Sequence, residues 1–373
     1  MKNVIKTGLK IVSVAVLLYF FLVSIGLMGS AFKGFGKGFA ENLIKTTSNP
    51  FVGLFIGILA TSVVQSSSTT TSVVVGIVGA GGITVSNAIP IIMGANIGTT
   101  VTNTLVSLGH VGRREEFRRA ISAATVHDFF NLICVAIMFP LELATGFLEK
   151  SATLMSTLFQ DVGGVKFVSP IKLVTKPAVH LTHEIMLWIS GSALASYILM
   201  LIFSMLLLFF SLYFIVKVMK SLVINRAEII MDNVLSRSSI LGLFAGLFFT
   251  IIVQSSSITT SLMIPLVAAG ILTIEAVFPI TIGANIGTTT TAILASFATG
   301  NISAIIIAFA HFLFNLTGTL FIYPIKFFRI IPINLAKAFG DLAAEKKRYA
   351  VIYVLGVFFF LPALLIFLSR YFK

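Results

Sequence analysis

The chain has 373 residues, of which 57% are hydrophobic and only 10% are charged. Its mean hydropathy of +1.05 is far above that of soluble proteins. The net charge of +13 does not indicate nucleic-acid binding, because the basic residues lie between apolar runs and not in clusters with aromatic residues. A single cysteine, Cys134, excludes an intrachain disulfide and a cysteine-rich metal site. The composition indicates a polytopic membrane protein.

Apolar runs long enough to cross a bilayer, about 20 residues each, recur along the chain. The first, at 11–31, follows Lys2, Lys6 and Lys10 and resembles a signal peptide, but its apolar run is longer, so we expect a retained span. Further spans are expected at 85–108, 120–140, 193–216, 274–297, 302–323 and 350–368.

Two apolar segments in each half are too short to cross a bilayer comfortably. Residues 51–64 and 69–80 flank one Gln-Ser-Ser-Ser motif, and residues 240–253 and 258–269 flank a second. Irregular backbone at membrane depth has to be buried in protein or line a cavity. We therefore expect each pair of segments to form a re-entrant hairpin with its serines at the tip.

The polar motifs of the first half return in the second half. Gln-Ser-Ser-Ser begins at residues 65 and 254, and Gly-Ala-Asn-Ile-Gly-Thr-Thr begins at 94 and 283, so both motifs are offset by 189 residues. His127 and Asn131 also recur, with a small slip, as His311 and Asn315. Two apolar halves with matching polar interruptions are typical of secondary transporters, whose binding site forms where the repeats meet.

The number of spans between the repeats determines their relative orientation. Three spans, at 85–108, 120–140 and 193–216, separate the two expected hairpins, and an odd number of crossings inverts the second repeat. Basic residues at 113–119 and 217–237 then lie on the cytoplasmic side, as the positive-inside rule requires, and the connector around 145–185 lies outside. The predicted fold is an all-α polytopic membrane protein with two inverted repeats. Each repeat has a re-entrant hairpin and a transmembrane helix broken at its glycines, Gly94 and Gly98 or Gly283 and Gly287.

This organisation divides the chain into five regions. They are an N-terminal span and connector (1–48), transport repeat 1 (49–140), an external connector (141–189), a span with transport repeat 2 (190–325), and a C-terminal connector with a final span (326–373).

The motif regions are nearly free of charge. Lys, Arg, Asp and Glu are absent between residues 46 and 112, and Glu275 is the only such residue between 238 and 325. Side-chain and backbone oxygens suit hard cations such as sodium, whereas hydroxyl and N–H donors at helix N-termini suit an oxyanion. Because bound cations can neutralise a bound dianion, this chemistry predicts cation-coupled anion transport.

At these residues the sequence resembles the type II sodium-dependent phosphate cotransporters, over about residues 49–140 and 241–325. The resemblance is strongest at Gln65–Ser68, Pro90–Thr100 and Phe117–Asn131 and at their second copies. It implies sodium-driven import of inorganic phosphate through a multi-pass protein of the plasma (inner) membrane, by alternating access in an elevator-like or rocking motion. Sodium is a co-substrate and no cofactor is expected; the oligomeric state is left open, with a homodimer as one option.

The resemblance and the chemistry together assign three groups of residues. The expected phosphate-binding residues are Ser66, Ser67, Ser68, Thr69, Ser255, Ser256 and Ser257. The expected sodium-binding residues are Gln65, Asn96, Thr99, Thr100, Gln254, Asn285, Thr288, Thr289 and Thr291. Structural or gating roles are expected for Gly94, Gly98, Gly283, Gly287, His127, Asn131, His311 and Asn315.

Two of these assignments have an alternative. The four glycines could form a Gly-x-x-x-Gly packing face instead of breaking a helix. The histidines could equally be interior residues that hold Asn131 and Asn315, or have a ligand or gating role.

Other functions fit the sequence less well than transport. Ser67, His127 and Asp128 could suggest a serine hydrolase, but the Gly-x-Ser-x-Gly nucleophile elbow is absent. A hydrolase with one serine nucleophile also has no need of a second Gln-Ser-Ser-Ser motif. A passive anion channel would use the same hydroxyls and helix ends. Within the transporters, a different oxyanion or proton coupling is the alternative, although a proton relay needs a buried carboxylate that the hairpins lack.

Overall fold

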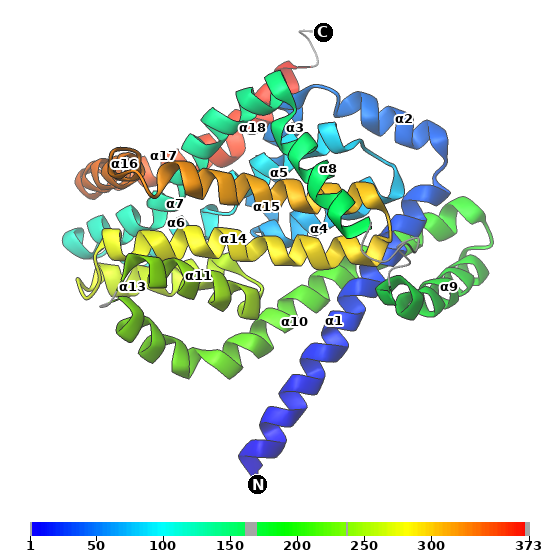
Figure 1. Ribbon diagram of the computed structural model, residues 1–373, viewed down its shortest axis with the longest axis horizontal. Coiled ribbons are helices and arrows are strands. Elements are labelled where there is room, and N and C mark those ends of the chain that lie inside the picture. The colour runs from blue at the N-terminus through cyan, green and yellow to red at the C-terminus, as the bar shows by residue number, and fades with distance from the viewer. Residues whose placement is uncertain (1, 161–169, 236–237, 370–373) are drawn as a thin grey trace.

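The computed structural model describes residues 2–160, 170–235 and 238–369 (Figure 1). The first half contains α1 (Lys2–Gly34), α2 (Lys37–Thr46), α3 (Pro50–Val64), α4 (Ser67–Ala80), α5 (Val85–Gly98), α6 (Val101–Leu108) and α7 (Arg114–Thr145). Next come α8 (Phe147–Gln160), α9 (Pro170–Ser190) and α10 (Ala193–Leu235). The second half contains α11 (Ser239–Val253), α12 (Ser256–Ser261), α13 (Met263–Ala268), α14 (Ile274–Thr299), α15 (Ile302–Ile322), α16 (Lys326–Glu345), α17 (Arg348–Leu355), the π-helical turn η1 (Gly356–Phe360) and α18 (Leu361–Leu368). Every regular element in these ranges is a helix, which confirms the all-α prediction.

Seven helical segments of the described ranges are long and apolar enough to cross a membrane. They are Lys6–Gly34, Val85–Leu108, Arg114–Thr145, Ala193–Leu222, Ile274–Thr299, Ile302–Ile322 and Arg348–Leu368, and each covers one span expected from the sequence. Helices suit lipid because they satisfy their own backbone hydrogen bonds. The chain is therefore a multi-pass membrane protein. A further pair, Gly38–Thr46 with Pro50–Val64, would count as one more span, although it is bent by 93°.

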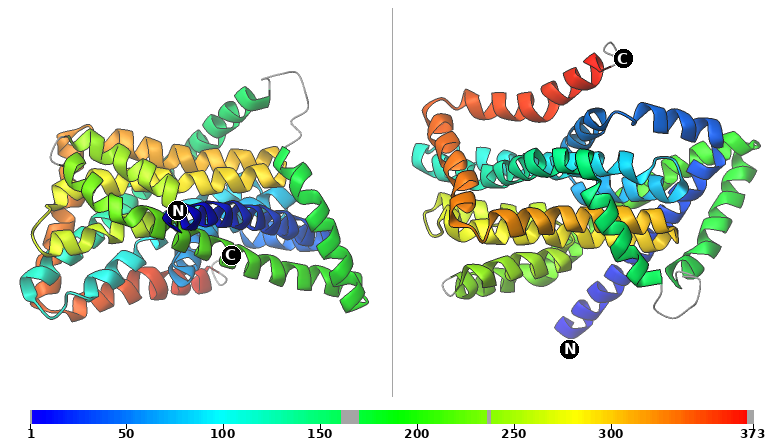
Figure 2. Two further views of the ribbon diagram at one scale, coloured as in Figure 1. Left: turned by 90° about the horizontal axis from the view of Figure 1, so that it is seen from below. Right: turned by 45° about the horizontal axis from the view of Figure 1, so that its top comes forward.

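The helix α14 lies at the centre of the molecule. Within its most apolar stretch of 18 residues 83% are buried, against 17% for the final span. It runs along the longest axis beside α15 and contacts α4, α7 and α11 (Figures 1 and 2). The N-terminal part of α1 instead projects from the body (Figure 2). Both halves of the chain therefore contact one central helix.

Two equivalent helix pairs pack closely through glycine. In the first half α3 packs on α5, and a Cβ added at Gly57 or Gly94 would collide with the backbone of Ile91 or Leu54. In the second half α11 packs on α14, and Gly246 and Gly283 are enclosed in the same way. Small residues let helices in lipid approach to backbone contact. The repeat in the sequence is therefore a repeat in packing.

This packing corrects the predicted helix breaks. The helix α14 is continuous through Gly283 and Gly287, so the expected break in the second span is wrong. In the first half the helix is interrupted at Thr99 and Thr100, after the glycines. Gly98 and Gly287 face the backbone of the neighbouring helix, at Ile58 and Leu247. The structure supports the alternative of a Gly-x-x-x-Gly packing face, because the neighbouring helix occupies the space that side chains at these glycines would fill.

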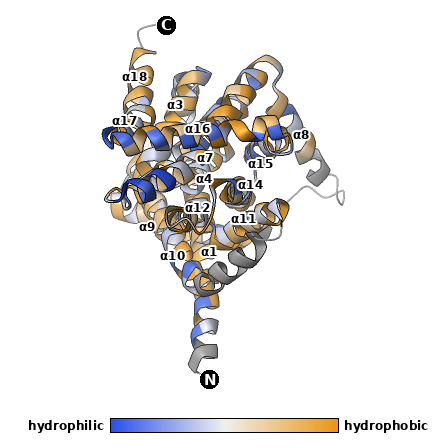
Figure 3. Cartoon of the chain, turned by 90° about the vertical axis from the view of Figure 1, so that its left-hand side faces the viewer, coloured by the Kyte–Doolittle hydropathy of each residue, from blue (hydrophilic) through white to orange (hydrophobic). Residues whose placement is uncertain are grey.

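Several segments expected to be connectors are helical. Residues 114–119 form the first turns of α7, and the C-terminal connector is largely α16. The 141–189 connector contains α8 and α9, with 161–169 outside the described residues. Hydrophilic residues gather around α16 and α17 at one end of the molecule (Figure 3). The bundle therefore has a hydrophilic end near α16, and the start of α9 lies at the opposite end, where Lys172 covers Gly300.

Candidate functional site

Each Gln-Ser-Ser-Ser motif joins two short helices by the same local geometry. Gln65 ends α3 and Gln254 ends α11, both in the left-handed conformation with φ of 56° and 59°. The next residues, Ser66 and Ser255, are extended, and their hydroxyls cap the following helix by accepting from the N–H groups of Thr69 and Ile258. The predicted interruption between short helices is confirmed in both halves.

The left-handed glutamines are backbone exceptions. They are the only non-glycine residues with positive φ in the part of the chain that the structure describes. Such a conformation costs on the order of 1–3 kcal/mol and is typical of functional sites. The strained conformation occurs at the same motif position in both halves. This repetition indicates that the left-handed turn has a role in the site.

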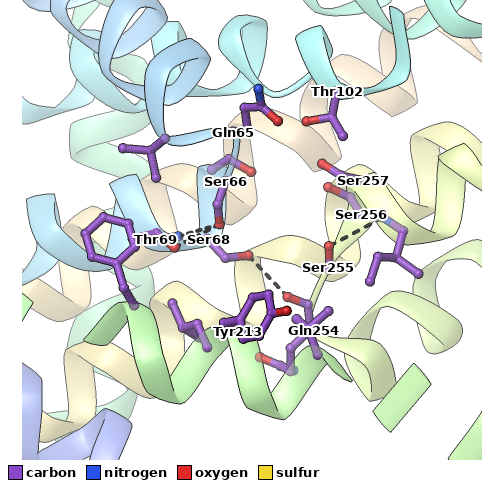
Figure 4. Close-up of a pocket in the computed structure, with 16 residues that line it drawn as sticks. Gln65, Ser66, Ser68, Thr69, Thr102, Tyr213, Gln254, Ser255, Ser256 and Ser257 are labelled. Atoms are coloured by element: carbon purple, nitrogen blue, oxygen red, sulfur yellow. Dashed lines mark hydrogen bonds between the residues drawn. The ribbon is translucent and has the colours of Figure 1, made fainter. Parts of the chain in front are cut away.

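The two motifs meet at one cavity of about 300 Å³ (Figure 4). The Ser68 hydroxyl donates to the backbone oxygen of Gln254 at 3.5 Å. Thr291 donates to Gln254 Oε1 at 2.8 Å and lies 3.5 Å from Ser68 Oγ. Residues that are 186 and 223 positions apart in the sequence are therefore in direct contact.

The cavity has a polar side and an apolar side, and none of the described residues that line it is charged. The two motifs supply Gln65, Ser66, Ser67, Ser68 and Thr69 on one side and Gln254, Ser255, Ser256 and Ser257 on the other. Phe209, Leu212, Tyr213 and Val216 of α10 form an apolar wall. Backbone N–H groups in the first turns of α4 and α12 lack partners within their helices and add donors. The site can hold an oxyanion through N–H and O–H donors and a hard cation through oxygens.

The glutamines and their threonines differ between the halves. Gln254 is tied down, since its amide nitrogen donates to the backbone oxygen of Ile251 and its oxygen accepts from Thr291. Gln65 is exposed to the cavity. Thr102, the residue 189 positions before Thr291, lines the cavity with a buried hydroxyl that has no hydrogen-bond partner among the described residues. Sequence reasoning missed Thr102, although the repeat offset would have found it.

Four buried asparagines form a separate network between the halves. Asn131 donates to the backbone oxygen of Asn96 at 2.9 Å, and its repeat equivalent Asn315 donates to that of Asn285 at 3.2 Å. The Asn285 amide then donates to the side chains of Asn131 and Asn315 at 2.8 and 3.1 Å. All four are at most 2% exposed. The network joins the halves in the core and does not line the cavity.

The histidines do not hold the asparagines. Asn131 and Asn315 bond to other asparagines, while the ring nitrogens of buried His311 have no hydrogen-bond partner in the described ranges. His127 lies beside Asn285. Hydrogen bonds to Asn96 and Asn285 therefore hold Asn131 and Asn315 in place.

Most of the threonines expected to bind sodium lie away from the cavity. Thr99, Thr100, Thr288 and Thr289 are at most 2% exposed, and each donates to a carbonyl of its own helix. Only Thr291 of this group reaches the two motifs. Asn96 and Asn285 belong to the buried network instead.

A buried carboxyl group lies where the first broken span is interrupted. Asp128 is fully buried, its Oδ2 accepts from the hydroxyl of Tyr353 at 3.1 Å, and it lies beside Thr100. An ionisable residue inside a membrane span is a functional candidate by default. The sequence suggests Asp128 only as part of a hydrolase triad, although its place as the one Asp, Glu, Lys or Arg of the expected span 120–140 was a signal for a site residue.

The sequence profile of the Na+/Pi-cotransporter family matches residues 20–160 and 206–324. The chain is similar to sodium-dependent phosphate transport protein 2B of Homo sapiens, at 36% identity over 92% of this chain and 63% of that protein. It is also similar to sodium-dependent phosphate transport protein 2A of Rattus norvegicus, at 36% identity over 96% and 68%. The chain thus spans about two thirds of the length of these relatives. No solved structure matches it. The extent of these matches shows that the chain belongs to the Na+/Pi-cotransporter family.

Proposed function

We propose that the protein is a sodium-coupled secondary active transporter that imports inorganic phosphate across the plasma (inner) membrane by alternating access. The observation that carries the proposal is the single cavity in which both Gln-Ser-Ser-Ser motifs meet. The family is one of cotransporters, and the relatives are named for sodium-dependent phosphate transport. Neither the family nor the repeated motif suggests an enzyme.

Phosphate would bind between the two motifs. Serine hydroxyls and first-turn N–H groups can donate to a tetrahedral oxyanion from both sides, and helix N-termini favour negative charge. The cavity wall includes Ser66–Thr69 and Ser255–Ser257, as expected from the sequence. Because no cationic side chain is found among the described residues of the wall, sodium ions would supply the neutralising charge.

Sodium would bind to the oxygens beside this site. Gln65 and Thr102 offer oxygens that accept no hydrogen bond from a described residue. Gln254 and Thr291 are the equivalent pair in the second half, where the Gln254 oxygen accepts from Thr291. Asp128 lies beside Thr100 at the chain break and would add a carboxylate to a cation site there.

The helix directions support inverted repeats with re-entrant hairpins. From the shared cavity, α4 runs to Gly79, which lies against Thr299 at one end of α14. The short helices α12 and α13 run to the opposite end, where Gly270 shares a cavity with Ile274. These ends are about 38 Å apart along a helix of this length. The two arms therefore leave the site in opposite directions, as alternating access between transport repeats 49–140 and 190–325 requires.

The substrate and the coupling ion are tested by uptake of radiolabelled phosphate into proteoliposomes that contain the purified chain. We expect uptake with an inward sodium gradient, little with potassium, lithium or a proton gradient, and competition by arsenate, which has similar size and protonation. Sulfate should compete poorly, because it lacks the O–H donor that phosphate retains. Equal uptake with potassium would contradict sodium coupling, and strong sulfate competition would favour a carrier for another oxyanion.

A further inference from the structure

A second polar cavity lies at the end of the molecule where α4 and α14 end. It has a volume of about 220 Å³ and is formed by α1, α9 and the last turns of α4 and α14. Three lysines line it: Lys33 from α1, and Lys172 and Lys176 from the first two turns of α9. Hydroxyl groups of Ser30 and Thr299 also belong to the wall.

Two lysines of this cavity have no acidic partner in the part of the chain that the structure describes. Among the described residues that line the cavity there is no Asp or Glu. Lys33 and Lys176 make no ion pair or hydrogen bond with any residue that the structure describes. Lys172 covers Gly300 at the end of α14 and has a partner of its own. Like charges within about 10 Å repel one another, so an anion in this cavity would be attracted by all three.

The cavity at the opposite end includes a carboxylate, that of Glu275, beside its basic residues. Arg118 is paired with Glu115 and Asp341, and Lys337 with Glu275. Those cations also lie at the end that the positive-inside rule assigns to the cytoplasm. The rule does not explain three lysines at the other end, which the order of spans assigns to the outside. Their presence there indicates a use for positive charge.

The lysine cavity is aligned with the central site. The helix α4 connects them, and the distance from Ser67 to Gly79 along this helix is about 18 Å. Between the cavities α4 packs on α14, and Val75, Val78 and Ala295 of these helices are at most 1% exposed. Gly79 fits against the side chain of Thr299, and both residues line the lysine cavity.

We propose that the lysine cavity is an anion-binding vestibule, which captures inorganic phosphate before the contact between α4 and α14 opens. The inference rests on the proposed phosphate transport and adds a second, cationic site to it. Lysine ammonium groups hold phosphate as point charges and exchange it readily. The charged outer site would raise the rate at which phosphate is captured, because positive charge attracts the anion. The uncharged central site would then bind phosphate for transport.

The test compares Lys33→Gln/Lys176→Gln with wild type in phosphatidylcholine vesicles. Sodium-dependent phosphate uptake is measured against phosphate concentration at low ionic strength and at about 0.5 M salt, where charge steering is screened. We expect the KM of the double variant to rise roughly threefold to tenfold at low salt, with Vmax within about twofold. The difference should shrink at high salt. Lys45→Gln/Lys150→Gln removes the same charge elsewhere and should keep the wild-type KM.

A second variant fills the cavity without removing charge. A Cβ at Gly29 meets no atom within 4 Å and would point into open space on the cavity wall. Gly29→Leu should therefore also raise the KM for phosphate. Wild-type KM in both this variant and the double lysine variant would overturn the vestibule.

The same KM shift in the Lys45→Gln/Lys150→Gln control would also overturn the vestibule, because total charge would then be the cause. An anionic lipid headgroup offers the same phosphate chemistry, so the assay is repeated with phosphatidylglycerol in the vesicles. A defect found only in those vesicles would assign the lysines to lipid and overturn the proposal. A wild-type chain without sodium-dependent uptake would overturn the proposed function and the vestibule together.

Discussion

Gln65 and Gln254 combine a strained backbone with a useful side chain. A left-handed residue lets the chain turn between two short helices, and glycine would do so with less strain. Glutamine is found at both positions, so the amide group is the feature that glycine could not supply. An amide offers both donors and an acceptor, which suits a site for an anion beside a cation.

We expect Gln65→Ala and Gln254→Ala each to reduce phosphate uptake at low phosphate by about one to two orders of magnitude. Gln254→Ala leaves the Thr291 hydroxyl without its acceptor, and Gln65→Ala removes an amide that the bound sodium or phosphate would use. We expect each loss to cost roughly 1–3 kcal/mol. Uptake is normalised to the amount of folded protein from size-exclusion chromatography. Near-normal uptake by both variants would return the glutamines to a packing role.

Thr102 and Thr291 provide a matched pair. Thr291→Val should lower thermal stability by about 1 kcal/mol, because it removes the bond to Gln254. Thr102→Val removes a hydroxyl that has no partner among the described residues, so stability should be kept or raised while the sodium concentration for half-maximal uptake increases. Melting temperature and sodium activation are measured for both. Equal loss of stability in the two variants would contradict the inference that Thr291 is hydrogen-bonded and Thr102 is not.

At the scale of helices, glycine contacts hold one equivalent helix pair together within each half of the chain. The pairs α3 with α5 and α11 with α14 depend on backbone contact at Gly57, Gly94, Gly246 and Gly283. Overpacking a core costs about 1–3 kcal/mol, so these positions tolerate no side chain. Conserved spacing of glycine between the halves thus reflects equivalent helix crossings.

Gly246→Ala should lower the melting temperature, because its Cβ would collide with the backbone of Ile280. The expected loss is about 1–3 kcal/mol. The control is Gly8→Ala in an exposed turn of α1. The added Cβ has no atom within 4 Å there, and alanine has a higher helix propensity than glycine. Loss of stability by Gly8→Ala but not by Gly246→Ala would contradict the close contact between α11 and α14 at Gly246.

Helix positions could be predicted from the sequence more fully than helix contacts. Apolar run length located all seven candidate spans, and the duplicated motif located the interruptions at Gln65 and Gln254. The continuity of α14 could not be predicted, since Gly283 and Gly287 suit a break as well as a crossing. The asparagine network and the unpaired Thr102 depend on how the halves face each other, which no local pattern contains.

At the scale of the whole molecule, both Gln-Ser-Ser-Ser motifs line one cavity, and the short helices that follow them end at opposite ends of α14. Lys33, Lys172 and Lys176 line a cavity at one of these ends, and Arg118 pairs with Asp341 at the other. This arrangement predicts that equivalent positions of the two repeats face opposite sides of the membrane.

Single cysteines at Ala80 and Ala269, which are 189 positions apart at the ends of α4 and α13, test this inversion. Each is introduced after Cys134, the only cysteine, is replaced by alanine. An impermeant thiol reagent added from one side should label one position far faster, and the preference should reverse from the other side. Labelling of both positions from the same side would rule out inverted repeats.

Coupled transport itself is tested most directly by accumulation of phosphate against its own gradient. Proteoliposomes are loaded with phosphate at the outside concentration, and an inward sodium gradient is then imposed. The account predicts that internal phosphate rises above the outside concentration and that collapse of the sodium gradient by an ionophore reverses the rise. Phosphate that only equilibrates, with or without the sodium gradient, would contradict the account and identify a passive anion pathway.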